Sequence, residues 1–386
     1  MVLPKTRIGL FTCWLLCSLM LSVAQPSDAP KDSAILHEFE IEANARRIIV
    51  PLTIGSRTIP FMIDTGASVG VYDDTLKTLL GTPIRKVTIS MSSVRREAEL
   101  FESAEATIGT LRLPTNTTVF LFDLKPVSRA TRCEVRGVIG MNQMRGFCWQ
   151  IDCDAKKVRV LSRVPEEPGI DVALTYPKTG TPYVACRLAK GLPESFLIDT
   201  GSPQSVIVEQ RLFDSLVASG QIKVVGQIAA SDGNGRMWFP TVGRLRDFSV
   251  GEIVLNNLLV LRGGKNVIGM RFLARFVTTL DFPNSKVYLK PGRRFEEPDT
   301  TAIQGFSLFF AGEDLTVVTV EQDGPADKAG LKLNDVIVGI DGEEIVGKTI
   351  FEIDHMIEKP AQELKLRIRR DDSISHMKIA IPKLAM

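Results

Sequence analysis

The sequence predicts a mainly β protein, with two tandem β lobes followed by a small α+β domain. The stretch FMIDTGASVGVYDD, from Phe61, returns as FLIDTGSPQSVIVE, from Phe196. Each copy then reaches a second shared phrase, GVIGMNQMRGF from Gly137 and NVIGMRFLARF from Asn266. The segment after about residue 300 repeats neither phrase. Two homologous units and an unrelated third one are therefore expected.

Composition and charge describe an ordinary globular protein. The chain has 386 residues, of which 44% are hydrophobic and 24% charged, which allows two or three domains. The formal charge of +2 includes Lys5 and Arg7 and falls to zero without residues 1–24, which contain no acidic residue. Neither nucleic acid nor an anionic membrane surface is therefore predicted as a partner.

The N-terminal residues 1–24 are predicted to be a signal peptide. Lys5 and Arg7 precede an uncharged, mostly apolar run that ends in Ser22–Ala24, a small-residue cleavage site. This pattern indicates export to the periplasm or the extracellular space. The alternative is an uncleaved membrane anchor, for which the run is slightly short.

Four cysteines follow this segment, and an even count in an exported chain permits two disulfides. Cys148 and Cys153 fall in what reads as one strand, too far apart to bridge unless that strand bends. The pairing stays open among Cys133, Cys148, Cys153 and Cys186. No cysteine spacing suits zinc and the three histidines are scattered, so no metal is expected.

The two copies share more than their motifs. Each Asp-Thr-Gly turn follows a predicted hairpin and precedes a predicted short helix, which ends before Gly81 or Gly220. The second shared phrase is followed by another hairpin in both copies. The predicted lobes are therefore 37–163 and 170–291, joined by a linker, RVPEEPG, at 163–169.

Two apolar-Asp-Thr-Gly turns, each with a later apolar-apolar-Gly in its own lobe, resemble the aspartic peptidases. Ala67 after the first motif is closer to the retroviral type, and the duplication within one chain resembles the pepsin arrangement. The resemblance implies a catalytic pair, Asp64 and Asp199, acting on a polypeptide between the lobes of a monomer, without a cofactor. Two neighbouring carboxylates share one proton, so that one activates water while the other polarises the carbonyl group.

The family pattern also implies residues that support the pair. The two threonine hydroxyls bond across to the other lobe, glycines allow the turns to pass closely, and the later apolar-Gly segments pack beneath. These roles fall on Thr65, Gly66, Thr200, Gly201, Ser202, Gly140 and Gly269. In pepsin-like enzymes a hydroxyl at the position of Ser202 bonds the carboxylate and lowers its pKa, so the shared proton is expected on Asp64. The alternative is that Pro203 bends the turn and directs the Ser202 hydroxyl elsewhere.

A flap over the substrate is expected from hairpins in both lobes. The first spans about 84–103 and lacks the tyrosine of animal and fungal pepsins. The second has Asp232-Gly233 or Asn234-Gly235 at its tip. Trp238 follows that tip and either covers the substrate site or packs in the core; both interpretations stay open.

The segment DGPADKAGLKLNDVIVGIDGEEI, from Asp323, resembles the PDZ family in the form common in bacterial exported proteases. The domain is predicted at 300–386, with a helix near 350–358 that opens with a Thr349–Glu352 capping box. The resemblance implies that a C-terminal peptide adds as a strand, opposite the helix face of Ile350, Phe351 and Ile353. The implied peptide-binding residues are Gly305, Phe306, Ser307, Leu308 and Ile350.

Together these features predict an exported aspartic endopeptidase with a PDZ module for peptide or partner binding. One alternative is a catalytically silent peptide-binding scaffold, because a fold alone does not fix function. Another is a protease that is active only when lobes of two chains pair. Whether the PDZ groove recruits ligands or is occluded also stays open.

Overall fold

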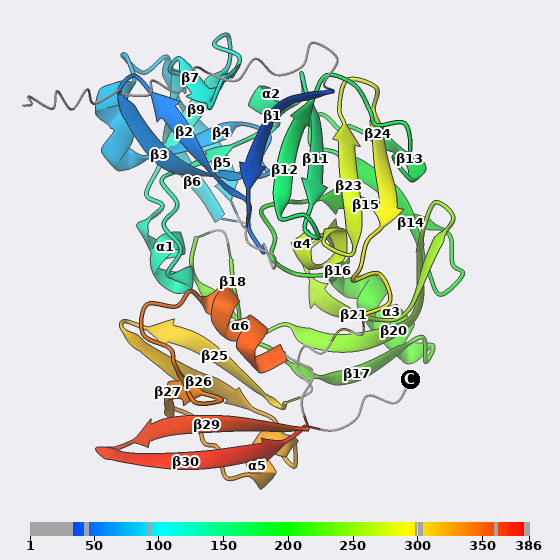
Figure 1. Cartoon of the computed structure of the whole chain (residues 1–386). Helices are drawn as coiled ribbons and strands as arrows, with labels where there is room; N and C mark the ends of the chain where they lie inside the picture. Colours follow the sequence, from blue (N-terminus) through cyan, green and yellow to red (C-terminus); the bar gives the residue numbers. More distant parts are fainter. Residues whose placement is uncertain are drawn as a thin grey trace, which may run out of the picture. The chain divides into compact units, whose positions relative to one another are not determined.

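The computed structural model describes residues 34–41, 46–91, 94–232, 234–297, 299, 304–358 and 362–381. The predicted signal peptide at 1–24 lies outside these ranges. No helix within them is long and apolar enough to cross a membrane. Strands predominate, as the sequence predicts, and they form three large sheets (Figure 1).

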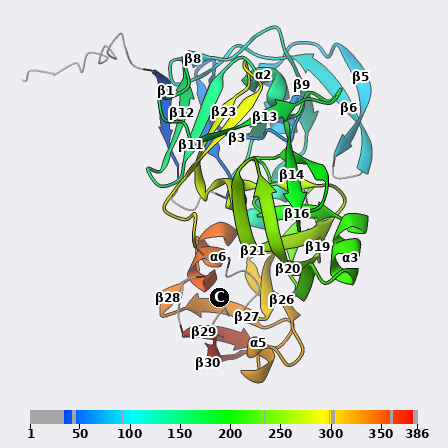
Figure 2. The same cartoon turned by 90° about the vertical axis from the view of Figure 1, so that its right-hand side faces the viewer.

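The first copy builds a nine-stranded sheet. Its strands are β2 (Ile49–Ile54), β3 (Arg57–Ile63), β4 (Gly70–Asp73), β5 (Arg85–Met91), β6 (Val94–Glu102), β7 (Ala106–Ile108), β8 (Leu111–Arg112), β9 (Thr118–Phe122) and β10 (Gly137–Ile139). Their order is β5-β6-β9-β4-β10-β3-β2-β7-β8. Because β10 runs parallel to β3, with Ile139 opposite Ile63, the Gly that follows β10 lies beside the Asp that follows β3. The β5–β6 hairpin forms one edge of the sheet (Figure 2).

A thirteen-stranded sheet contains strands of both copies. From the first copy come β1 (Ile35–Glu40), β11 (Cys148–Asp152) and β12 (Lys157–Leu161). The others are β13 (Ile170–Thr175), β14 (Tyr183–Leu188), β15 (Pro193–Ile198), β16 (Val206–Glu209), β17 (Ile222–Gln227), β20 (Thr241–Val250), β21 (Ile253–Gly263), β22 (Val267–Ile268), β23 (Phe276–Asp281) and β24 (Lys286–Pro291).

The copies meet in this sheet where β11 pairs with β23, with Gln150 opposite Thr279. The two predicted C-terminal hairpins of the copies, β11–β12 and β23–β24, thus lie side by side (Figure 1). One hydrophobic core runs through both copies. In the second copy β22 runs parallel to β15, as β10 does to β3 in the first.

The helices are short. They are the 3₁₀ helix η1 (Asp74–Leu79), α1 (Lys125–Thr131), α2 (Met141–Met144), α3 (Gln210–Ala218), α4 (Met270–Leu273), α5 (Pro325–Lys328) and α6 (Ile350–Glu358). The predicted helices after the two turns are η1 and α3. Phe213 is buried on the inner face of α3, while Leu76 is the buried residue of η1.

The C-terminal domain has its own core and a separate sheet, with the strand order β25-β26-β27-β29-β30. These strands are β25 (Phe306–Ala311), β26 (Asp314–Val320), β27 (Val336–Ile340), β29 (Glu363–Arg370) and β30 (Ser373–Ala380), and β28 (Glu343–Glu344) pairs with β27. The predicted capping box is present, since Thr349 N–H donates to Glu352 at 2.6 Å and Glu352 N–H donates to Thr349 Oγ1 at 3.3 Å. β25 is an edge strand, and α6 is the helix predicted opposite it.

The disulfides that the cysteine count permits are not formed. Cys148, Cys153 and Cys186 are buried free thiols, so two bridges among four cysteines are excluded. Burial raises the pKa of the Cys148 and Cys153 thiols to about 12. These side chains act as small apolar residues of the core.

Candidate active site

Each Asp-Thr-Gly turn begins where a buried strand ends. Phe61 and Ile63 of β3 are buried, and the next residue is Asp64, whose backbone N–H donates to Ile139 O at 3.1 Å. In the second copy the N–H of Asp199, which follows β15, donates to Ile268 O at 2.9 Å. The apolar strands and their parallel neighbours therefore fix the backbone position of each Asp.

Each carboxylate is held by the backbone of its own turn. Asp64 Oδ1 accepts hydrogen bonds from the N–H groups of Gly66, at 2.7 Å, and Ala67, at 3.2 Å. Asp199 Oδ1 accepts from Gly201, at 3.0 Å, and Ser202, at 3.1 Å. These bonds occupy the Oδ1 atom of each carboxylate, and the two carboxyl side chains also interact with each other.

Buried threonines tie the two turns together. Thr65 N–H donates to Thr200 Oγ1 at 3.1 Å, and Thr200 N–H donates to Thr65 Oγ1 at 3.0 Å. Each hydroxyl then donates across to the other copy, Thr65 to Ile198 O at 2.6 Å and Thr200 to Ile63 O at 2.9 Å. Both side chains are completely buried, so this four-bond link is shielded from water.

The glycines bring the carboxylates face to face. A Cβ atom added to Gly66 would lie 2.6 Å from Asp199 Cγ, and one added to Gly201 would lie 2.5 Å from Asp64 Cγ. Burial, and after it the charge of Asp199, raises the pKa of Asp64 to about 7. The pair therefore holds a proton at pH values where a free carboxyl group is ionised.

The later glycines pack against the turns from below. A Cβ on Gly140 would lie 2.7 Å from the Val69 backbone, and one on Gly269 would lie 2.4 Å from Gln204 O. The next residues continue the contact, since the N–H of Met141 donates to Ala67 O, and Met270 N–H donates to Ser202 O, both at 2.8 Å. The structure thus brings together all nine residues that the sequence assigns to the catalytic centre.

Ser202 contacts Asp199 differently from the expectation. Its backbone N–H reaches the carboxylate, but no hydrogen bond joins its hydroxyl to Asp199 in the described part of the chain. The Oγ atom instead lies near Gly269, 3.0 Å from where a Cβ on that residue would be. Ala67 N–H makes the same backbone contact in the first copy, so the hydroxyl does not account for an asymmetry between the carboxylates.

Both predicted hairpins are present. β5 and β6 pair from Arg85–Leu100 to Met91–Val94. In the second copy β18 (Ala230–Ser231) pairs with β19 (Met237–Trp238), and a Cβ on Gly235 at its tip would lie 2.4 Å from Pro126 O of α1. This hairpin thus rests on the first copy. Trp238 is half-buried, with its ring near Gly263.

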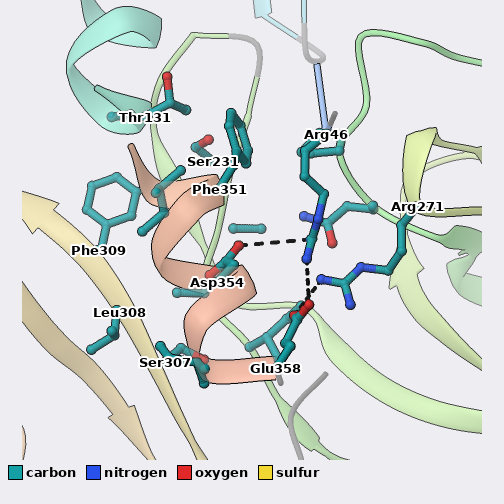
Figure 3. Close-up of a pocket in the computed structure, with 18 of the residues that line it drawn as sticks. Arg46, Thr131, Ser231, Arg271, Ser307, Leu308, Phe309, Phe351, Asp354 and Glu358 are labelled. Carbon is teal, nitrogen blue, oxygen red and sulfur yellow. Dashed lines mark hydrogen bonds and ion pairs between the residues drawn. The ribbon is translucent and has the colours of Figure 1, made fainter. Parts of the chain in front are cut away.

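The predicted PDZ peptide site lies in a pocket shared with the protease lobes (Figure 3). Phe306, Ser307 and Leu308 of β25 line one side and Ile350 of α6 the other. Gly305, just before β25, has a φ of +74°, which favours glycine. Ile353, expected on the groove face, is instead fully buried in the domain core. Phe351 and Asp354 line the pocket as well, and Asp354 points toward Arg46 of the lobes (Figure 3).

The opposite wall of this pocket comes from the protease lobes, including Thr131 of α1 and Pro203 and Gln204. The last two follow the second Asp-Thr-Gly-Ser motif directly. The PDZ groove therefore opens next to the turn that carries Asp199. The sequence alone does not indicate this adjacency, because it joins segments more than 100 residues apart.

A cluster of ion pairs attaches α6 to the lobes (Figure 3). Glu358 pairs with Arg46 and with Arg271, each at 2.6 Å, and Arg46 Nη1 lies 3.9 Å from Asp354. Burial opposes ionisation of Glu358, but the two arginines outweigh it and lower its pKa. No motif marks these residues, and the only signal in the sequence is a charged pair, Arg46-Arg47, before an apolar strand.

Three other carboxylates, Asp73, Asp74 and Asp123, lie close enough to hold a cation. The oxygens of Asp73 are already used: Oδ1 accepts from the N–H and hydroxyl of Thr75, and Oδ2 accepts from Leu124 N–H. Asp73 therefore caps η1, and this cluster is explained by the local fold.

Comparison with known families agrees with both resemblances. Residues 50–143 match the family described as "Aspartyl protease", and residues 292–381 match "PDZ domain". The first match contains Asp64 and Gly140. The chain thus carries an aspartyl protease domain and a C-terminal PDZ domain, as predicted.

Two curated proteins match shorter segments. Carboxy-terminal processing protease CtpB of Bacillus subtilis (strain 168) is 33% identical over 110 residues, covering 28% of this chain and 21% of that protein. A probable periplasmic serine endoprotease DegP-like of Ectopseudomonas mendocina (strain ymp) is 36% identical over 70 residues, covering 18% and 14%. The chain therefore spans about a fifth or less of the length of these relatives.

Among solved structures, basic 7S globulin from soybean aligns with a TM-score of 0.43 and 11% identity, covering 69% of this chain and 97% of that one. This similarity is low, and the fold is defined by the strands of this chain and their pairing.

Proposed function

We propose that this chain, with its aspartyl protease and PDZ domains, is an exported aspartic endopeptidase. The main support is that Asp64 and Asp199, from turns 135 residues apart, face each other because Gly66 and Gly201 have no side chain between them. Two carboxylates in such contact share a proton. That proton and the remaining negative charge are what peptide hydrolysis by activated water requires.

In this mechanism the ionised carboxylate takes a proton from water as the water attacks the peptide carbonyl carbon. The protonated carboxyl group, Asp64 at the start of the cycle, donates to the carbonyl oxygen, and a tetrahedral diol forms. Transfer of a proton to the leaving nitrogen then breaks the C–N bond and releases a carboxylic acid and an amine. The Thr65–Thr200 link holds both carboxylates in place throughout.

Export and the role of the PDZ domain belong to the same proposal. Residues 1–24 support export, and one matched relative is itself named as periplasmic. The edge strand β25 and helix α6 supply a groove for peptide or partner binding, beside the turn of Asp199. Since both carboxylates come from one chain, the dyad needs no second copy.

The test is digestion of a denatured protein by the purified chain between pH 3 and 7. Cleavage that pepstatin blocks and a serine-directed inhibitor leaves unchanged is the expected result. Cleavage with the opposite inhibitor pattern, or no cleavage at any pH, would overturn the aspartic assignment.

A further inference from the structure

Arg47 is a partly buried cation for which the catalytic scheme above has no use. Its Nε and Nη1 atoms are closed to solvent and donate to no acceptor among the described residues. Buried charged donors are almost always paired, because an unmade bond to a charged group costs more than one to a neutral group. Such an exception calls for a functional explanation.

The pairing of β2 and β3 places Arg47 beside the catalytic turn. Ile49 lies opposite Met62, and Ile63 N–H donates to Ile48 O at 2.9 Å. The next step of the same antiparallel register sets Arg47 opposite Asp64. Burial lowers the pKa of Arg47, whereas the thiol of Cys133 and, after it, the negative charge of Asp64 act in the opposite direction.

On its other side Arg47 meets the PDZ domain. Its guanidinium carbon lies 5.4 Å from the centroid of the Phe351 ring. Phe351 belongs to the first turn of α6 and lines the pocket of the peptide groove (Figure 3). Arg47 therefore lies between Asp64 and Phe351, which lines that pocket.

The neighbouring Arg46 is a cation with a structural role, and it is paired with a carboxylate. Arg46 pairs with Glu358 at 2.6 Å, and Arg271 pairs with the same carboxylate. Arg47, one residue along the chain, has no such carboxylate partner in the described structure. The difference indicates that its partner arrives with a ligand.

We propose that Arg47 binds a carboxylate of the substrate polypeptide, and so selects substrates with an acidic group close to the scissile bond. This inference depends on the proposed function for its setting. The planar guanidinium group, held against Phe351, has the fork geometry that matches a carboxylate. Because its Nε and Nη1 atoms are closed to solvent, the substrate carboxylate must displace the contacts that cover them. The carboxylate comes from an Asp or Glu side chain or from the free C-terminus of the substrate.

The test measures peptide binding to the full chain carrying Asp199→Asn, so that turnover does not interfere. A neutral host peptide with an amidated end is compared, at pH 6, with versions in which one Glu occupies each position in turn. A further version has no Glu but a free C-terminal carboxylate. The same set is measured with Arg47→Met, with Arg47→Lys, and with Arg57→Met as the matched control, since Arg57 is exposed at the far end of the hairpin.

We expect at least one carboxylate position to tighten Kd about tenfold over the host peptide, as one charge-assisted bond allows. Arg47→Met should reduce this ratio to below about twofold, Arg47→Lys should retain part of it, and Arg57→Met should retain all of it. The peptide version that binds more tightly shows whether the carboxylate comes from a side chain or from the C-terminus.

Equal Kd values for all versions, no binding by any version, or a preference that survives Arg47→Met would overturn the inference. Wild-type cleavage of the same peptides is measured separately. A carboxylate preference without cleavage would reject the endopeptidase and retain the site, while cleavage without a preference would reject the site alone.

Discussion

The close approach of the two carboxylates depends on the absence of a Cβ atom at Gly66. The Cβ of an alanine there would lie 2.6 Å from Asp199 Cγ, a distance that forces the carboxylates apart. We expect Gly66→Ala to lower kcat/KM at least about a hundredfold, because small displacements of reacting groups have effects of that size.

The matched control is Gly81→Ala, where an added Cβ meets nothing within 4 Å. It should leave kcat/KM near the wild-type value in the same peptide assay. A Gly66→Ala protein with wild-type kinetics would show that the two carboxylates need not face each other.

We expect the pKa of Asp64 to set the upper pH limit of the proposed activity. Burial and the neighbouring Asp199 raise it to about 7, so the shared proton is retained below that pH and lost above it. The pH profile of kcat/KM should therefore fall on its alkaline side with an apparent pKa near 7, a value that belongs to the pair. A rate that stays level to pH 9 would be incompatible with a required proton on the dyad.

The residues of the catalytic turns could be predicted because each belongs to a repeated motif. Arg47 could not, since nothing in the sequence distinguishes a partly buried cation from an exposed one. The hydroxyl of Ser202 was expected on Asp199 but lies against Gly269, because the turn places the backbone N–H on the carboxylate. Side-chain direction within a turn depends on the packing around it, which motif comparison does not supply.

Among the elements, the two turns act as one unit through Thr65 and Thr200. Thr65→Val keeps the shape of the side chain but leaves Thr200 N–H and Ile198 O without their partner. We expect a loss of roughly 1–3 kcal/mol in the free energy of unfolding, the penalty for a buried unsatisfied group, measured by urea denaturation.

Thr53→Val is the control for that experiment. The Thr53 hydroxyl bonds Thr58 at 3.1 Å on the exposed side of the same hairpin, where water replaces the lost contact. If both substitutions have equal effects, the cross-link between the turns contributes nothing specific to stability.

The alternation of apolar and polar residues, together with the turn residues, predicts the hairpins and the helix of the PDZ domain. It also predicts the hairpin that ends each copy. It does not predict the joining of β11 to β23. Gln150 and Thr279 are far apart along the chain, and alternating strands look alike whichever neighbour they pair with. The two copies therefore share one sheet, which the sequence of neither copy indicates by itself.

At the scale of the whole molecule, Glu358 joins the PDZ helix to the lobes. Glu358→Gln would remove the carboxylate that Arg46 and Arg271 share, while Arg46 keeps Asp354 at 3.9 Å and Arg271 keeps Asp299 at 3.2 Å. We expect a loss of roughly 1–3 kcal/mol in the free energy of unfolding in urea, as for a hydrogen bond between charged groups.

Glu313→Gln is the matched substitution at a second contact between the same parts. Glu313 pairs with Arg132 at 2.7 Å, but its side chain is 97% exposed, so its loss should have little effect. Equal changes at the two positions would rule out Glu358 as the anchor of the PDZ domain.

The most direct test of the whole account compares wild type, Asp64→Asn and Asp199→Asn in the cleavage of a denatured protein at the optimum pH. Each substitution keeps the side-chain shape and removes one carboxylate of the pair. We predict that the wild-type chain cleaves and that either variant loses roughly a thousandfold or more in rate, because the pair acts as a unit. Cleavage at the wild-type rate by either variant would contradict catalysis by the Asp64–Asp199 dyad.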